Sequence, residues 1–287
     1  MTFPESELTL NAKGEVYHLG LLPENISHQI ILVGDQDRVE KISAYFDEVE
    51  YKQQHREFVT HTGTYKGKRL SVISTGIGTD NIDIVLNELD ALVNIDLKTR
   101  EAKPEKTSLQ MIRIGTCGIL QGEINVHDYI LSKYSVGLDN IAHFYDIPFT
   151  DLEKTAVLKI QDAMALPKAI VPYMIASDAD LNEKLMGPKV HAGITVTSSG
   201  FYGPQSRQLT LKTHSVGLAD RLTAFEGIPE KVTNFEMETS AIFALSRGMG
   251  HQASAICLGL ANRVTKEFSK DYTQPMEELI QYVLDRI

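Results

Sequence analysis

The sequence predicts an α/β fold in which helices flank a largely buried sheet. Apolar runs rich in β-branched residues recur along the chain, at residues 29–33, 68–75, 111–114, 129–131, 193–197 and 254–260. Between these runs lie segments whose apolar residues have helical spacing. Strands that alternate with helices are typical of α/β folds with a buried sheet.

Three segments carry a helical stripe of apolar residues, at 82–93, 237–248 and 276–284. In the first, the apolar residues recur at the intervals that line one face of a helix. Asp80 and Asn81 precede this stripe as candidate N-caps, because their side chains can accept hydrogen bonds from the first turn. The third stripe begins near Pro275, a residue type that is favoured at a helix start.

Residues 146–188 follow no regular period and contain Pro148, Pro167, Pro172 and Pro188. We therefore expect a long insertion or a flap in this part of the chain. Its composition does not resemble that of a flexible interdomain linker. The expected organisation is therefore a single domain over residues 1–287.

The composition argues against several classes of partner. The chain has 28 basic and 38 acidic residues, a formal charge of −10, so it repels a polyphosphate backbone and no nucleic-acid partner is expected. No run approaches the roughly 18 apolar residues of a membrane span, and the N-terminal segment has no signal-peptide pattern. Cys117 and Cys257 lie in apolar runs and form no CxxC pair, so we expect two reduced, buried thiols. A cytoplasmic protein without a membrane partner is expected.

Common catalytic and metal-binding motifs are missing from the sequence. It has no GxSxG, HExxH or GxxxxGK[ST] motif and no closely spaced cluster of histidine and cysteine. A serine hydrolase, a metal enzyme or a P-loop protein is therefore not expected, and we assign no metal ligands.

Glycines and small polar residues follow three of the predicted strands, with an arginine nearby, in the segments 34–38, 76–79 and 113–118. Glycine lets a ligand approach main-chain N–H groups, and arginine offers a planar fork to phosphate oxygens. Such strand ends converge on one crevice in open α/β sheets. Arg113 interrupts an apolar strand, where a charge must be paired or bound to something. We therefore expect a site for a small oxyanion, phosphate in particular.

Two further segments each have two explanations from the residues alone. Glu236 and Glu238 open the second helical stripe, where they could complement the helix dipole or could accept hydrogen bonds from vicinal hydroxyls. Gln205 and Arg207 follow Phe201 after another strand. They could form a surface turn, which is the commoner case, or could read the edge of a flat polar heterocycle.

Taken together and in this order, these segments resemble the nucleoside phosphorylase-I family. The likeness runs from Tyr17-His18-Leu19-Gly20 to Asn262-Arg263 and is weakest between about 145 and 190. It implies a central, mixed and twisted sheet or distorted barrel that is flanked by helices.

The resemblance also implies roles for individual positions. The phosphate would lie against Gly34, Arg38, Arg56, Arg113 and Thr116. The ribose would contact His18, Met237, Glu238 and Glu236, and the base would contact Phe201, Gln205 and Arg207. Catalysis would rest on Arg207, Gln205 and Glu238. His18 and Arg56 would come from a neighbouring subunit, which implies a homodimer with shared active sites that can assemble into a hexamer.

The implied reaction is cleavage of uridine by inorganic phosphate, the co-substrate, to give uracil and ribose 1-phosphate without a cofactor. Purine-cleaving relatives place an aspartate after the late strand, where it can protonate N7. This chain has Asn262 there, and uracil has no N7, so a pyrimidine is favoured. The alternatives are a purine nucleoside phosphorylase, a nucleosidase that uses water, or a non-catalytic nucleoside or anion sensor of the same fold.

Some relatives also hold a monovalent cation between the positions of Glu57, Ile77 and Asn81. Asn81 replaces a serine there, which counts against a cation site in this protein. The preference among uridine, deoxyuridine and thymidine stays open.

Overall fold

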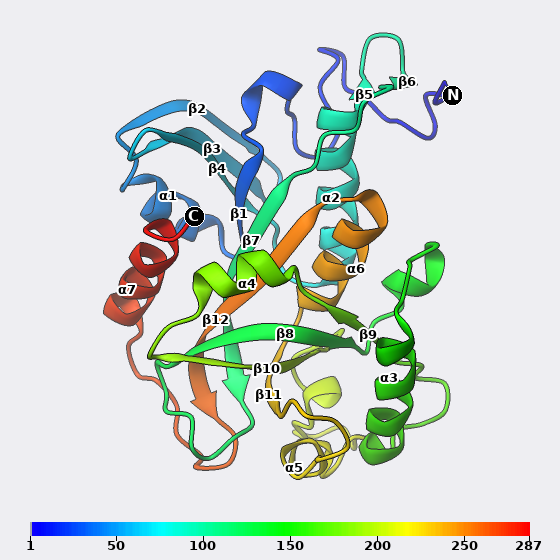
Figure 1. Ribbon diagram of the computed structural model, residues 1–287, viewed down its shortest axis with the longest axis vertical. Coiled ribbons are helices and arrows are strands. Elements are labelled where there is room, and N and C mark those ends of the chain that lie inside the picture. Colours follow the sequence, from blue (N-terminus) through cyan, green and yellow to red (C-terminus); the bar gives the residue numbers. More distant parts are fainter. Residues whose placement is uncertain (1) are drawn as a thin grey trace.

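A computed structural model describes residues 2–287 and confirms the α/β fold (Figure 1). The strands are β1 (Gln29–Val33), β2 (Glu48–His55), β3 (Phe58–Tyr65), β4 (Lys68–Ser74), β5 (Ile95–Asp96), β6 (Glu101–Ala102), β7 (Gln110–Ile119), β8 (Tyr129–Gly137), β9 (Tyr173–Ala176), β10 (Val190–Thr197), β11 (Val232–Glu236) and β12 (Gln252–Asn262). The α-helices are α1 (Gln36–Ser43), α2 (Thr79–Asn94), α3 (Asp151–Met164), α4 (Ala179–Leu185), α5 (Leu218–Thr223), α6 (Thr239–Met249) and α7 (Thr273–Leu284). No helix within the described residues is both long and apolar enough to cross a membrane.

The main sheet is mixed and closes on itself at one end. Its strand order is β11-β10-β8-β12-β7-β1-β4-β3-β2, and a further antiparallel pairing joins β11 back to β7. Five strands, β7, β11, β10, β8 and β12, therefore form a barrel. Beyond β7 the sheet continues with β1 and β4, which are parallel to it, and then with the antiparallel strands β3 and β2. The mixed sheet and distorted barrel implied by the family resemblance are confirmed.

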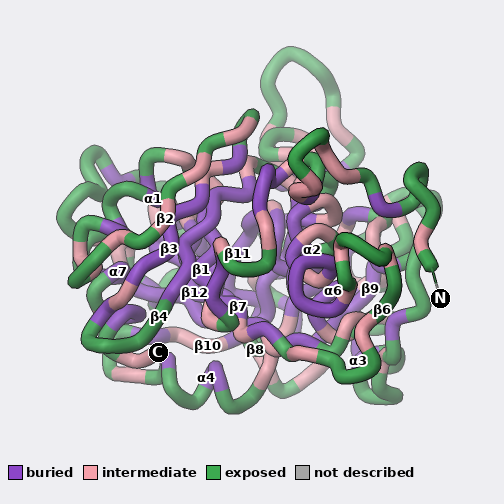
Figure 2. Tube along the Cα trace, turned by 90° about the horizontal axis from the view of Figure 1, so that it is seen from above, coloured by how far each residue is buried: buried purple, intermediate pink, exposed green. Residues whose placement is uncertain are grey.

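The central strands are apolar on both faces because helices cover both. In β1, Ile30 and Leu32 pack in the core that contains α2 and α6, while Ile31 and Val33 pack in the core that contains α1 and α7. Figure 1 shows these two helix pairs on opposite flanks of the strands, and Figure 2 shows the buried residues concentrated along the strands between them. The alternation follows from the two-residue period of a strand.

Helix α2 forms where the apolar spacing predicts it, but its expected N-cap is wrong. Gly78 is the N-cap, and Asp80 and Asn81 already lie in the first turn. Gly78 has a φ of +96°, a backbone conformation that other residues rarely adopt, and this lets the chain turn sharply out of β4. Asp80 still stabilises the helix start, because a negative charge complements the dipole there.

The expectation of an insertion or flap at 146–188 is also wrong, because this segment is part of the fold. It contains α3, β9 and α4, and β9 pairs with β8 in the main sheet. On α3, Ala156, Ile160 and Met164 are buried in the core around the barrel. The four prolines lie between these elements, where no backbone N–H is needed for a helix or a ladder. The prolines therefore mark the connections between helices and strands, not an irregular segment.

Candidate active site

The carboxyl ends of β1 and β4 meet at one edge of the sheet. Gly34 follows β1, and Thr75 and Gly76 follow β4. The N–H of Thr75 donates to the carbonyl oxygen of Val33 at 2.7 Å, and a Cβ on Gly34 would lie 3.4 Å from the carbonyl oxygen of Gly76. The two glycine-containing loops therefore lie against each other, as the strand-end pattern predicts.

Arg38 is a buried cation with few partners in the protein. It lies on α1, which begins directly after β1 with Asp35 as its N-cap. Its side chain is 7% exposed, and its Nη1 donates to the carbonyl oxygen of Ile114 at 3.3 Å. Within residues 2–287 it has no acidic partner closer than 4 Å. Burial lowers the pKa of Arg38, and the charge of Arg113 lowers it further. Most of its five N–H donors thus remain available to an anion.

Arg113 lies on β7 and points into the same region, where it is paired with acidic groups. Its Nη2 donates to the carboxylate of Glu238 and lies 3.7 Å from Oε2 of Glu236. Burial alone would lower the pKa of Arg113, but the carboxylate charges outweigh it and raise the pKa. Gly115 is required beside it, because the guanidinium fills the space that a Cβ would occupy there. The expectation that a charge inside this strand must be paired is confirmed.

Glu238 is the N-cap residue of α6 and lies between the glycine loop after β4 and Arg113. It accepts a hydrogen bond from the N–H of Gly78 at 2.8 Å in addition to its pair with Arg113. Burial raises the pKa of Glu238; the charge of Arg113 opposes the shift, and the charge of Glu236 adds to it. One guanidinium thus faces two buried carboxylates.

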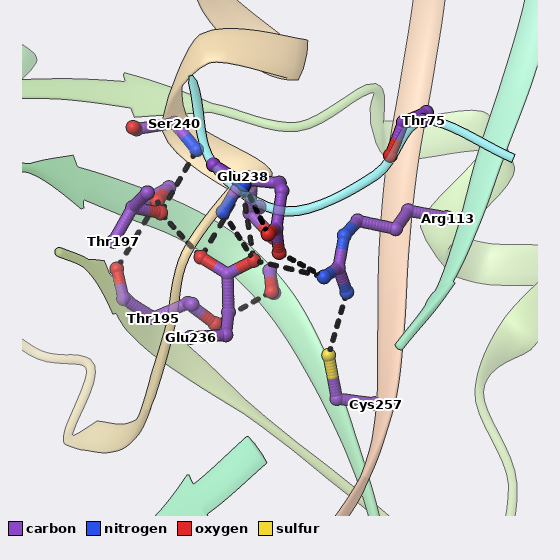
Figure 3. Close-up of polar contacts among 12 residues, drawn as sticks. Thr75, Arg113, Thr195, Thr197, Glu236, Glu238, Ser240 and Cys257 are labelled. Carbon is purple, nitrogen blue, oxygen red and sulfur yellow. Dashed lines mark hydrogen bonds and ion pairs between the residues drawn. The ribbon is translucent and has the colours of Figure 1, made fainter. Parts of the chain in front are cut away.

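Glu236 is the last residue of β11, and its carboxylate closes the start of α6. It accepts the N–H groups of Glu238 and Thr239, each at 2.9 Å, and the hydroxyl of Thr197. Figure 3 shows Arg113 on one side of the two glutamates, with Thr197 and Ser240 on the other. Glu236 therefore acts as a helix cap. Met237 lies between the two glutamates and is partly exposed, and within the described residues its N–H has no protein acceptor.

Phe201, Gln205 and Arg207 form one compact group. The Arg207 guanidinium lies 3.8 Å from the centroid of the Phe201 ring, and its Nη1 donates to Oε1 of Gln205 at 2.6 Å. Nε2 of Gln205 lies 3.5 Å from the carbonyl oxygen of Glu236, so this group adjoins the start of α6. A free surface turn, the commoner explanation from the residues alone, does not describe Gln205, which is buried.

Arg263, which sequence reasoning left without a role, also belongs to this group. Its Nη1 donates to the carbonyl oxygen of Gln205 at 3.0 Å. Burial and the charge of Arg263 lower the pKa of Arg207 to about 10, so Arg207 stays protonated at neutral pH. The sequence signal that could have indicated a role for Arg263 is its position directly after the last strand, next to Asn262.

Asn262 does not face this group. Its Nδ2 donates to the carbonyl oxygens of Gln121 and Ile124, and its Oδ1 accepts the N–H groups of Val264 and Thr265. All its hydrogen-bonding capacity is used within the fold. Asn262 therefore orders the turn that carries Arg263.

Thr116 lies three residues beyond Arg113 on β7 and is partly exposed. Within the described part of the chain its hydroxyl has no hydrogen-bond partner. The hydroxyl is thus available to a ligand at this edge of the sheet.

His18 and Arg56 lie together, and the Arg56 turn adjoins the start of α1, where Nε2 of Gln36 lies 3.4 Å from the carbonyl oxygen of Arg56. Arg56 is exposed, and its Nη2 lies 3.5 Å from the hydroxyl of Tyr17. The ring of Tyr17 packs edge-on against that of His18, whose Nδ1 lies 2.6 Å from Glu88. Arg56 has a φ of +55°, a strained conformation for a residue other than glycine, in the turn between β2 and β3. Within residues 2–287 neither side chain hydrogen-bonds to Arg38, Arg113 or Glu238.

A resident divalent metal ion would need several ligand side chains close together. Over residues 2–287, no group of three or more histidine, cysteine, aspartate or glutamate side chains is placed to hold one. Glu57 and Asn81, two of the positions considered for a monovalent cation, both lie against Gly76. No step considered below requires a cation.

The fold and this site define an α/β barrel protein with two buried arginines and two buried carboxylates beside the carboxyl ends of parallel strands. Residues 29–287 match the family described as the Phosphorylase superfamily, and the chain belongs to that family.

The similar proteins include phosphorylases for both classes of base. A uridine phosphorylase of Thermococcus kodakarensis is 32% identical over 271 residues, which cover 93% of this chain and 85% of that protein. That of Escherichia coli is 30% identical and covers 93% and 94%. A DeoD-type purine nucleoside phosphorylase of Oceanobacillus iheyensis is 27% identical and covers 94% and 98%.

The solved structures agree. A Trypanosoma brucei nucleoside phosphorylase that shows uridine phosphorylase activity superposes with a TM-score of 0.90 at 29% identity, covering 98% of this chain and 99% of that one.

Proposed function

We propose that this protein cleaves uridine with inorganic phosphate to give uracil and ribose 1-phosphate. The observation that carries the proposal is Arg38, a buried guanidinium with no acidic partner in the described chain, next to Arg113. A buried, unpaired charge is costly unless a ligand of opposite charge binds it. Phosphate is a fitting ligand, because the Arg38 guanidinium can offer it parallel N–H donors beside the positive charge of Arg113. A nucleosidase, which uses water, has no need of this arrangement.

The sugar would lie against Glu238 and the main-chain N–H of Met237, which we call the ribose clamp. Glu238 accepts hydrogen bonds from vicinal hydroxyls, and the free N–H of Met237 donates to one of them. Arg38, Arg113 and Thr116 hold the phosphate below the ring. A phosphate oxygen attacks C1′ while the bond from C1′ to N1 of uracil breaks, and the bonding pair leaves with the base. Positioning of the two reactants supplies much of the rate enhancement.

The base would lie beside Phe201, with Gln205 and Arg207 at its polar edge. Arg207 stays charged at neutral pH and can stabilise the negative charge that develops on a uracil carbonyl. Its hydrogen bond to Gln205 fixes both side chains, so the donors are oriented before substrate binds. Arg263 supports this pair through the main chain of Gln205.

Purine cleavage is the second candidate, favoured by the similarity to DeoD-type phosphorylases. A purine leaves readily only if a group near N7 donates a proton. The residue considered for that role, Asn262, has every donor and acceptor engaged within the fold. A uracil fits the Gln205 and Arg207 pair better. We therefore place uridine ahead of inosine.

We further propose that the active unit is a dimer in which His18 and Arg56 reach the neighbour's site. The two side chains lie together through Tyr17 and make no hydrogen bond to Arg38, Arg113 or Glu238 within the described residues. The strained turn at Arg56 carries an exposed guanidinium, and the loop with exposed Ile77 lies against this turn, since Gly76 contacts Glu57. Strain of this kind is retained where it serves a site. Dimers can assemble further, into a hexamer.

The test follows the ultraviolet absorbance of uridine with and without inorganic phosphate, with inosine as a control. Loss of uridine only when phosphate is present, with inosine intact, supports the proposal. Phosphate-dependent cleavage of inosine alone would show that the base assignment is wrong. Cleavage that is independent of phosphate would contradict the role of Arg38. No cleavage of either nucleoside would favour a sensor.

A further inference from the structure

Thr197, the last residue of β10, lies at the centre of a buried hydrogen-bond network next to the ribose clamp. It is fully buried, and its hydroxyl donates to the carboxylate of Glu236. The same oxygen accepts the N–H of Ser240 at 3.0 Å and lies 3.0 Å from Oγ of Ser135. The donor of this hydroxyl and at least one of its lone pairs are therefore used. Figure 3 shows Thr197 on the far side of Glu236 from Arg113.

Both main partners of Thr197 lie at the start of α6. Glu236 holds the N–H groups of Glu238 and Thr239, and Ser240 is the next residue along the chain. The hydroxyl thus fixes the carboxylate that in turn fixes the chain from 236 to 239. The ribose clamp lies on this short segment, so its position depends on the hydrogen bonds of Thr197.

The same segment is anchored from the other side. The hydroxyl of Ser240 donates to the carboxylate of Asp139 at 2.7 Å, which also accepts the hydroxyl of Tyr173 at 2.8 Å and the N–H of Ile141 at 2.9 Å. Asp139 is buried, and within residues 2–287 it has no basic partner within 4 Å. Burial and the charge of Asp139 raise the pKa of Tyr173, which therefore remains a donor. The start of α6 is thus held by hydroxyl groups whose donors point in defined directions.

We propose that Thr197 is a positioning residue of the ribose clamp. Acting through Glu236, it sets where the Glu238 carboxylate and the Met237 N–H meet the 2′-hydroxyl of the nucleoside. This inference rests on the proposed function and assigns Thr197 no contact with substrate. It predicts that loss of the hydroxyl changes discrimination at the sugar and leaves discrimination at the base as it was.

Thr195 supplies a matched control on the same strand. It lies two residues earlier, on the same face of β10, and is also fully buried. Its hydroxyl contacts Oγ of Ser132 at 2.6 Å and Oδ1 of Asn234 at 2.9 Å, and makes no contact with Glu236. Thr195→Val therefore removes an equally buried hydroxyl without touching the ribose clamp.

The experiment measures kcat/KM for uridine and for 2′-deoxyuridine in the wild type and in Thr197→Val, Thr197→Ser and Thr195→Val, with thermal unfolding of each. Because Glu236 is charged, we expect Thr197→Val to lower kcat/KM for uridine roughly 10- to 100-fold. The loss for 2′-deoxyuridine should be clearly smaller, since that substrate lacks the hydroxyl concerned. The ratio of kcat/KM for uridine to kcat/KM for 2′-deoxyuridine should therefore fall in Thr197→Val. In Thr197→Ser and in Thr195→Val this ratio should equal that of the wild type.

Two results would overturn the inference: an unchanged ratio in Thr197→Val, or an equal change of the ratio in Thr195→Val. If Thr197→Val does not fold, Thr197→Cys carries the test, because a thiol donates more weakly than a hydroxyl and a lowered ratio is again expected. A wild type that cleaves inosine instead refutes the base assignment, and the ratio is then measured with inosine and 2′-deoxyinosine. A wild type that cleaves no nucleoside overturns both the proposed function and this inference.

Discussion

Replacing Arg38 by methionine removes a buried positive charge and keeps most of the apolar stem that packs around it. In the folded protein the pKa of Arg38 lies below its ordinary value because of burial and the charge of Arg113. The folded state therefore binds this proton less tightly than an unfolded chain does, and at neutral pH the charge costs stability. The variant should be more stable than the wild type in the absence of ligand and should bind phosphate poorly.

The two magnitudes follow from the contacts. Replacing a poorly compensated buried charge by an apolar side chain typically gains about 1 kcal/mol or more, which for a chain of this size raises Tm by roughly 2–4 °C. A bidentate contact of an arginine with phosphate makes two charge-assisted hydrogen bonds. At about 1.5 kcal/mol each, their loss should raise the KM for phosphate on the order of 100-fold.

Thermal unfolding across a series of phosphate concentrations measures both effects. A ligand that binds only the folded state raises Tm with its concentration, so the wild type should respond to phosphate and Arg38→Met should begin higher and respond little. Lys41→Met, an exposed change on the same helix, is the control and should match the wild type. A variant that is destabilised without phosphate and still responds to it would refute the reasoning.

Four further predictions concern the same site. Because burial raises the pKa of Glu238, kcat/KM should fall as pH drops through that raised value, and in Glu238→Gln the pH–rate profile should lose this acid limb. Gly115→Ala should push the Arg113 guanidinium aside and raise the KM for phosphate at least roughly tenfold, seen in steady-state kinetics. Arg207→Ala should lower kcat on uridine on the order of 10²–10³-fold; full activity in single-turnover assays would contradict its role at the leaving base. Co-expressed Arg56→Ala and Arg113→Ala chains should recover about one quarter of wild-type activity through mixed dimers, whereas no recovery would show that Arg56 acts within its own chain.

The sequence pattern anticipated the elements whose apolar residues face a core on both sides or along one stripe. The strands β1 and β4 and the helices α2, α6 and α7 belong to this class. The strands β2 and β3 were not predicted, because at the edge of the sheet β2 alternates polar and half-buried residues. Closure of the barrel was not visible either, since it depends on the pairing of β11 with β7 across more than 100 residues of chain. Local spacing carries no information about such a pairing.

The role of a site residue could be predicted from the sequence where its residue type is unusual for the predicted element. Arg113 is a charged residue in an apolar strand, which predicts a partner of opposite charge. In the structure this partner is Glu238. Asn262 shows the opposite case. Its residue type suggested a part in base choice, yet its four hydrogen bonds to the surrounding turns show that it serves the fold. Whether a residue serves the site or the fold depends on the direction of its side chain, which a single sequence does not show.

The charges of the site supply an independent argument for a shared active site. Arg38 and Arg113 carry two positive charges, and Glu236 and Glu238 carry two negative ones, all of them buried. This set is neutral before any ligand enters. A phosphate carries between one and two further negative charges at neutral pH, which the buried set does not offset. A third arginine would offset this charge, and our proposal assigns that role to Arg56, exposed in a strained turn, from a second copy of the chain. The proposed dimer would therefore meet an electrostatic need of the site in addition to fitting the family resemblance.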